Sequence, residues 1–95
     1  MADNATWLLG EPYGGELGGC CISATLRDYG RLGLFAKAQY TGTESQAVDH
    51  AFMQASTAPS RGYDGYGYLW WLWGDDVFSA IGIFGQHIYI NPALD

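Results

Sequence analysis

Residues 65–92 limit what this chain can fold into more than any other part of the sequence. They hold three apolar runs rich in aromatic and β-branched residues, at 66–73, 77–84 and 87–90. Gly74-Asp75-Asp76 is turn-forming sequence between the first two runs. The connections are too short for a crossover helix, so neighbouring strands should be antiparallel. The first two runs are apolar at successive positions, so we expect both faces of the sheet to need cover.

Residues 25–38 carry the signals of a helix. Thr25 can cap the free amides at the start, and Asp28 lies where a carboxylate favours a helix N-terminus. One face collects apolar positions at helical spacing: Leu26, Tyr29, Leu32, Gly33 and Ala36. Gly30 and Gly33 each cost about 1 kcal/mol relative to alanine in a helix. We therefore expect a close contact against the helix backbone at these glycines.

A second helix is expected over residues 44–55. Thr43 and Gln46 form a capping-box pattern before it. An apolar stripe follows at Ala47, Val48, Ala51, Phe52 and Ala55. Residues 1–24 hold few periodic signals and many glycines, which predicts an irregular loop. The order of elements predicts one α+β domain over residues 1–95, with two helices packed on a three-stranded antiparallel meander.

Composition excludes several classes of protein. The chain is 48% hydrophobic and 15% charged, which is typical of a folded chain and not of a disordered one. With four basic residues and a net charge of −6, it lacks the positive patch that nucleic acids or anionic membranes require. No apolar run is long enough to span a membrane, and the N-terminus lacks the features of a signal peptide. We expect a cytoplasmic protein without nucleic-acid or membrane partners.

Cysteine and histidine give little indication of a reactive centre. Cys20 and Cys21 are adjacent, and a disulfide between adjacent residues is strained, so we expect reduced thiols packed in the core. A cysteine nucleophile would need a paired base, and nothing in the sequence brings His50 or His87 to this pair. The histidines lack the spacing of metal ligands. We expect no metal and no cofactor.

Two further groups have alternative interpretations. Asp75 and Asp76 could bind calcium or act as an acid–base pair, but a hairpin turn kept soluble by charge is the favoured interpretation. The aromatic residues could form a stacking platform for a sugar or another ring: Tyr66, Tyr68, Trp70, Trp71 and Trp73. For a chain of this length, a place in the core or in an oligomer interface is favoured.

Two segments resemble a known family when they are taken together. GGELGGCCISATLRDYGRLGLF and GYGYLWWLWGDDVFSAIGIFGQHIYINP are similar to the serine β-lactamase-related hydrolases. The closest branch is that of the esterases and the 6-aminohexanoate-dimer (nylon oligomer) hydrolases. The matching pieces cover nearly the whole chain in the right order. The resemblance implies part of a β-lactamase/penicillin-binding-protein-like fold and hydrolysis of esters or amides.

The resemblance also assigns roles to residues near the end of the chain. Gly82 corresponds to the glycine of a strand that lines the active site in this family. The backbone N–H of Ile83 corresponds to one of the two donors of the oxyanion hole, which stabilise charge on the carbonyl oxygen. Gln86, Tyr68 and Trp70 are the candidate substrate-binding residues.

The catalytic motifs of the family are missing from this sequence. Family members use a Ser-x-x-Lys nucleophile and a tyrosine from a second motif, but Lys37 is the only lysine and no serine precedes it by three residues. We expect a C-terminal fragment, a partial domain with no activity alone, which self-associates through its apolar sheet. One alternative is an esterase or amidase completed by a partner chain, to which this chain contributes the oxyanion strand. Another is a module that binds a small hydrophobic ligand.

Overall fold

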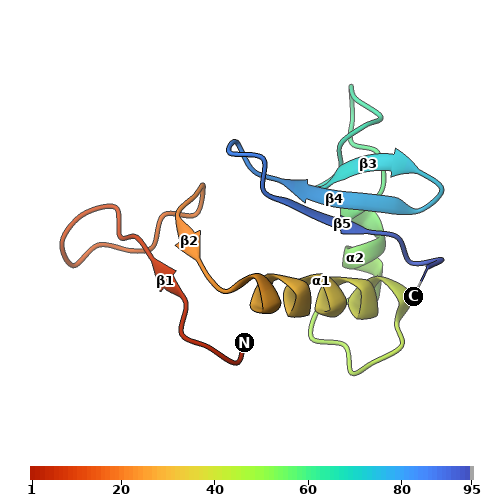
Figure 1. Cartoon of the computed structure of the whole chain (residues 1–95). Coiled ribbons are helices and arrows are strands. Elements are labelled where there is room, and N and C mark those ends of the chain that lie inside the picture. Colours follow the sequence, from red (N-terminus) through yellow and green to blue (C-terminus); the bar gives the residue numbers. More distant parts are fainter. Residues whose placement is uncertain (95) are drawn as a thin grey trace. The chain divides into compact units, whose positions relative to one another are not determined.

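The computed structural model describes residues 1–94, and Figure 1 shows their two helices and five strands. The helices are α1 (Leu26–Thr41) and α2 (His50–Ser56). The strands are β1 (Thr6–Trp7), β2 (Ile22–Ser23), β3 (Trp71–Gly74), β4 (Val77–Ile81) and β5 (His87–Ile90). The chain forms two compact units, residues 1–32 and 33–95, and the boundary falls within α1. The predicted α+β class is confirmed.

The first unit contains a strand pair where the sequence predicted only an irregular loop. β1 and β2 are antiparallel, with Thr6 opposite Ser23 and Trp7 opposite Ile22. The Trp7 indole N–H donates to two carbonyl oxygens of the intervening segment, those of Leu17 at 2.9 Å and Cys20 at 3.2 Å. Two-residue strands leave no periodic pattern in a sequence, so the loop prediction for residues 1–24 missed this pair. The pair is formed by contacts between residues far apart in the chain.

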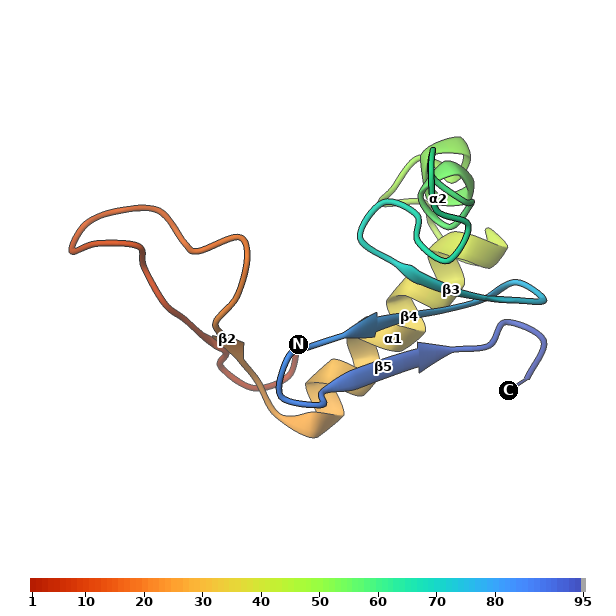
Figure 2. The ribbon, with the colours of Figure 1, turned by 90° about the horizontal axis from the view of Figure 1, so that it is seen from above.

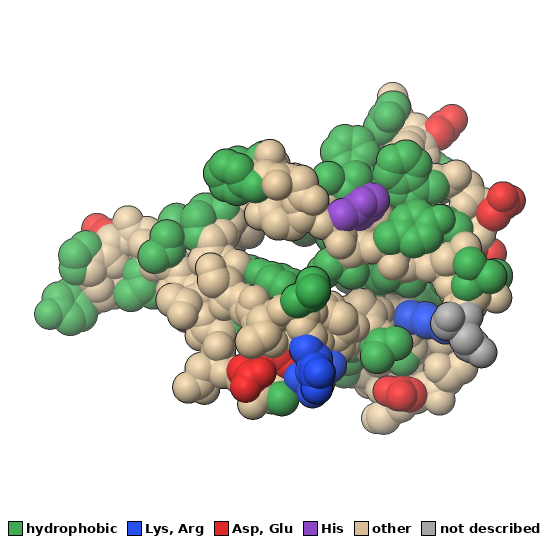
Figure 3. All heavy atoms as spheres, viewed as in Figure 1, with side chains coloured by type: hydrophobic (Ala, Val, Ile, Leu, Met, Phe, Trp, Pro, Cys, Tyr) green, Lys and Arg blue, Asp and Glu red, His purple; other side chains and the backbone are tan. Residues whose placement is uncertain are grey.

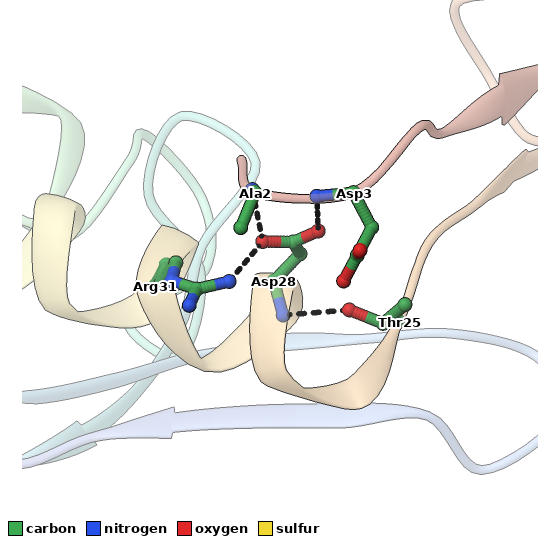
Figure 4. A network of polar contacts seen from close by, with 5 residues as sticks. All are labelled: Ala2, Asp3, Thr25, Asp28 and Arg31. Atoms are coloured by element: carbon green, nitrogen blue, oxygen red, sulfur yellow. Dashed lines mark hydrogen bonds and ion pairs between the residues drawn. The ribbon is translucent and has the colours of Figure 1, made fainter.

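The start of α1 matches the predicted cap. The Asp28 N–H donates to Thr25 Oγ1 at 3.2 Å. The Asp28 carboxylate is fully buried and accepts the N–H groups of Ala2 at 2.8 Å and Asp3 at 3.1 Å. Arg31 Nη1 lies 2.6 Å from Asp28 Oδ1 and completes this network (Figure 4). One buried carboxylate thus joins the N-terminal segment to the first turn of the helix.

The second unit contains the predicted antiparallel meander, in the order β3-β4-β5. Gly74 pairs with Val77, so Asp75 and Asp76 are the two residues of a tight hairpin turn. Their φ angles are 50° and 61°, the left-handed conformation that such two-residue turns require and that aspartate tolerates better than most residues. The turn interpretation of the aspartate pair is therefore confirmed.

The first two strands of the meander are shorter than predicted. β3 begins at Trp71, not at residue 66, because Leu69 has a φ of 67° that interrupts an extended chain. Gly67 lies so close to the end of α2 that a Cβ atom there would clash with the carbonyl group of Ser56, and it would be 2.9 Å from the carbonyl oxygen of Ala58. β4 ends at Ile81, since residues 82–86 turn back toward β5.

The core of the second unit lies between the helices and one face of this sheet. Phe78 is 1% exposed, and its ring packs on Tyr40 and Trp70 at centroid distances of 5.2 and 5.0 Å. The buried cluster is Ala36, Met53, Phe78 and Ile90. Figure 1 shows the C-terminal part of α1 below the sheet, and Figure 2 shows β4 and β5 crossing over it.

The predicted close contact against α1 is present at one glycine and not at the other. A Cβ atom on Gly33 would lie 3.2 Å from Ile88 Cγ2, so a glycine lets β5 approach the helix. A Cβ atom on Gly30 would meet nothing within 4 Å among the described residues. The prediction is therefore correct for Gly33 and wrong for Gly30.

The second helix begins later than predicted because a buried side chain holds the segment before it. Gln39 is 1% exposed, and its Oε1 accepts the N–H groups of Ala47 and Val48, each at 2.9 Å. These amides are therefore bound to Gln39 and do not enter a helix. Asp49 caps α2 by accepting the Phe52 N–H at 3.0 Å, so the capping box expected at residues 43–46 is wrong.

The buried side of α2 also differs from the predicted stripe. Met53 and Ser56 face the core, while Phe52 is 57% exposed. The side of α2 that faces the core follows from the start of the helix at His50 and from the burial of Met53 and Ser56. The apolar pattern alone favoured the wrong face.

Candidate functional site

The turn between β4 and β5 brings together three of the residues that the family resemblance selected. The Gly82 N–H donates to the Gln86 carbonyl oxygen at 2.8 Å, and the Gly85 N–H donates to that of Gly82 at 3.1 Å. The Gln86 side chain folds back over the turn, where its Oε1 accepts the Phe84 N–H at 2.9 Å. Gln86 is thus bonded within the turn itself.

Ile83 lies at the tip of this turn and is 92% exposed. Its N–H donates to no other described residue, unlike the amides of Gly82 and Phe84. A Cβ atom on Gly82 would lie 2.5 Å from Gln86 Oε1, so the Gln86 side chain would have to move to admit a larger residue there. The arrangement offers one free N–H donor to a carbonyl oxygen placed outside the turn, whereas a complete oxyanion hole has two donors.

The other two candidate substrate-binding residues lie in different surroundings. Trp70 packs edge-on against Phe78 beside the core. Tyr68 is 54% exposed and its ring lies 6.0 Å from that of Phe52 on α2. The structure therefore groups Gly82, Ile83 and Gln86, and it places Trp70 and Tyr68 against the core and α2.

The face of the sheet away from the core carries a row of aromatic side chains, which we call the open face. Trp71, Ser79 and Tyr89 lie side by side across the three strands. The Trp73 indole N–H donates to Ser79 Oγ at 2.8 Å, and Ser79 is fully buried beneath its neighbours. A buried hydroxyl with a bound donor fixes the position of the Trp73 ring.

His87 connects the aromatic rings of the open face. Its ring lies 6.4 Å from that of Trp73 and 6.0 Å from that of Tyr89, edge-on to the latter. Ile81 pairs with His87 and is 43% exposed. The sequence predicted that His87 and Tyr89 share a face, but it did not single out Ser79. Strand alternation was the signal that could have identified it.

The open face remains exposed among the described residues. Trp73 and Tyr89 are each 57% exposed and Trp71 is 40% exposed. Figure 3 shows hydrophobic side chains gathered over the sheet, with a histidine among them. The expectation that both faces need cover is met on one face by the helices. On the other face the described residues supply only partial cover, where the Tyr66 ring lies 5.0 Å from that of Trp71.

The cysteines differ from the prediction. Cys20 and Cys21 are joined by a disulfide, and Cys20 is exposed instead of packed in the core. Cys21 has a φ of 79°, a conformation that sequence reasoning does not foresee for a non-glycine residue.

Two other features of residues 1–94 bear on the kind of site. No three His, Cys, Asp or Glu side chains gather in a way that could hold a metal ion. Neither helix is long and apolar enough to cross a membrane.

Comparison of the sequence with protein-family models and with curated proteins gives no match. The interpretation of the chain therefore depends on its motifs, on the 82–86 turn and on the open face.

Proposed function

We propose that this chain is part of a serine hydrolase of the β-lactamase-related family, from the esterase or 6-aminohexanoate-dimer hydrolase branch. It has no hydrolase activity alone, and it associates with a second copy of itself in the cytoplasm. The two segments that resemble the family support this origin. An antiparallel sheet with helices on one face is compatible with a β-lactamase/penicillin-binding-protein-like fold.

The open face is the observation that carries the association. Contiguous exposed apolar surface marks interaction sites, and tryptophan and tyrosine contribute strongly to protein interfaces. The residues of this face include no Lys, Arg, Asp or Glu: Trp71, Trp73, Ser79, Ile81, His87 and Tyr89. Two copies could therefore meet through the same face without placing like charges opposite each other, despite the net charge of −6.

Light scattering after size exclusion tests the association. We expect a dimer for the unaltered chain and a monomer for Tyr89→Arg, because the new charge would be buried in the interface. Tyr13→Arg is the matched control, since Tyr13 is fully exposed, belongs to the first unit and not to the sheet, and its substitution adds the same charge. A compact monomer at high concentration would contradict the proposal. A small hydrophobic ligand on the same face is the competing proposal, and it predicts a monomer whose thermal unfolding shifts with added ligand.

A second function is favoured by the free N–H of Ile83 beside Gly82. In this alternative, a partner chain supplies the Ser-x-x-Lys nucleophile and the tyrosine. The nucleophile attacks an ester or small amide, and the Ile83 N–H stabilises the negative charge that develops on the carbonyl oxygen. The exposed tip of the turn is accessible to such a partner.

Ester or amide hydrolysis, measured on a mixture of this chain and the partner chain that supplies the nucleophile, tests this second function. Ile83→Pro removes the N–H, and we expect it to lower kcat by about 10²–10³-fold. Ile83→Ala is the matched control, because it keeps the N–H and should retain most of the activity. Labelling of this chain alone by a fluorophosphonate would contradict this assignment, because the proposal places the nucleophile in the partner chain.

A further inference from the structure

The Cys20–Cys21 disulfide lies in the segment that connects β1 to β2, directly before β2. Cys20 is exposed and Cys21 is half-buried, so a small reagent can reach the pair. The hydrolase proposed above gives this pair no role. It is an accessible sulfur–sulfur bond in a unit that contains no other cysteine.

The disulfide does not hold distant parts of the chain together. A cross-link stabilises a fold by restricting the unfolded chain, and this effect grows with the number of residues in the closed loop. Two adjacent residues enclose no loop, so the bond adds little stability of this kind. Its effect is local, because it restricts the peptide unit between the two cysteines.

The two cysteines supply carbonyl acceptors to β1 and to the residue after it. The Cys20 carbonyl oxygen accepts the Trp7 indole N–H at 3.2 Å. The Cys21 carbonyl oxygen accepts the Leu8 N–H at 3.1 Å. Cys21 has a φ of 79°, which L-residues rarely adopt without a constraint. The direction of both carbonyl groups therefore depends on a backbone conformation that the disulfide helps to hold.

We propose that Cys20 and Cys21 form a thiol–disulfide switch that controls the β1–β2 strand pair. In the oxidised chain, the closed ring keeps both carbonyl oxygens directed at Trp7 and Leu8. In the reduced chain, Cys21 leaves the left-handed conformation and these acceptors turn away. Other bonds near the pair join the Trp7 indole N–H to the Leu17 carbonyl oxygen at 2.9 Å and the Leu17 N–H to the Leu8 carbonyl oxygen at 3.1 Å. We expect these bonds to loosen with the strand pair, because each strand has only two residues.

The reductant is a small-molecule thiol of the glutathione class. Its thiolate attacks the exposed Cys20 sulfur, the Cys20–Cys21 bond breaks, and Cys21 leaves as a thiolate that takes up a proton. A second thiol then attacks the mixed disulfide and releases Cys20, also as a thiol. Two small thiols are oxidised to one small disulfide while the protein gains two electrons and two protons. Oxidation of the pair by the small disulfide is the reverse sequence.

Hydrogen exchange of the tryptophan indole N–H groups tests the switch on the full chain. Two-dimensional ¹⁵N NMR is recorded before and after reduction with dithiothreitol, with Trp7→Phe to assign the signal. We expect the Trp7 indole N–H to exchange on the order of tenfold faster after reduction, because local opening exposes it. The Trp73 indole N–H, bound to Ser79, is the internal control and should not change.

A double variant separates the disulfide from other effects of the reductant. Cys20→Ser combined with Cys21→Ser should show the fast exchange of the reduced chain in both oxidising and reducing buffer. Mass spectrometry after alkylation reports the redox state of the unaltered chain in each sample. Equal Trp7 exchange in the two verified redox states would overturn the proposal, and so would failure of the pair to oxidise in any glutathione buffer.

Discussion

Asp28 is the residue whose ionisation most affects the first unit. The Ala2 N–H lowers the pKa of this carboxyl well below its ordinary range, with help from the Arg31 guanidinium and the Asp3 N–H, while burial acts in the opposite direction. The folded chain thus binds the Asp28 proton less tightly than the unfolded chain does. The stability that this carboxylate contributes is present above about pH 4 and is lost as the pH falls through the folded pKa.

We expect Asp28→Asn to lower stability at pH 7 and to flatten the loss of stability in acid. The amide cannot ionise and cannot accept from Ala2, Asp3 and Arg31 as the carboxylate does. Urea unfolding at pH 7, 5 and 3 measures both effects. Asp3→Asn is the control, since the contact to Asp28 uses the backbone N–H of Asp3, which the substitution leaves in place. A pH dependence unchanged by Asp28→Asn would contradict this role.

At the scale of elements, α1 contains two glycines whose surroundings differ. Gly30 has free space where a side chain would lie, so Gly30→Ala should stabilise the chain by about 1 kcal/mol through helix propensity. Gly33→Ala should give a smaller gain or a loss, because its Cβ would lie 3.2 Å from Ile88 Cγ2. Chemical denaturation of the two variants gives the difference. Equal gains would mean that β5 does not restrict the helix at Gly33.

The elements that depend on local sequence could be predicted, and those that depend on distant residues could not. The turn at residues 75–76, the antiparallel order of three strands and the Thr25 cap depend on neighbours close in sequence, and all three are correct. The start of α2 depends on Gln39, which holds two amides eight and nine residues away. The capping pattern at residues 43–46 therefore predicted the wrong start, because the acceptor that binds these amides lies outside the pattern.

At the scale of the whole molecule, the proposed self-association through the open face predicts that stability depends on protein concentration. If a second copy covers the open face, the thermal midpoint of unfolding should rise with concentration, because association stabilises only the folded state. Tyr89→Arg should remove this dependence, and Tyr13→Arg should keep it. Calorimetry over a hundredfold range of concentration measures the midpoint. A midpoint independent of concentration in the unaltered chain would argue against the dimer.

The candidate site, like the fold, could be predicted only where its residues are near neighbours in the chain. Sequence resemblance selected Gly82, Ile83 and Gln86, which are near neighbours in the chain and share one turn. It also selected Tyr68 and Trp70, whose positions depend on the conformation of Leu69 and on the core. The aromatic run of residues 66–73 contains side chains that point to different places, and the composition of the run does not separate them.

The sequence alone determined the features set by near neighbours: the α+β class, the hairpin turn at residues 75–76 and the cap of the first helix. Only the tertiary structure decided that Cys20 and Cys21 are joined, that β1 pairs with β2, and which aromatic residues face the core. Propensity and periodicity act over a few residues, whereas burial and hydrogen bonding join groups from distant parts of the chain. Such partners are present in the sequence, but their contacts exist only once the chain has folded.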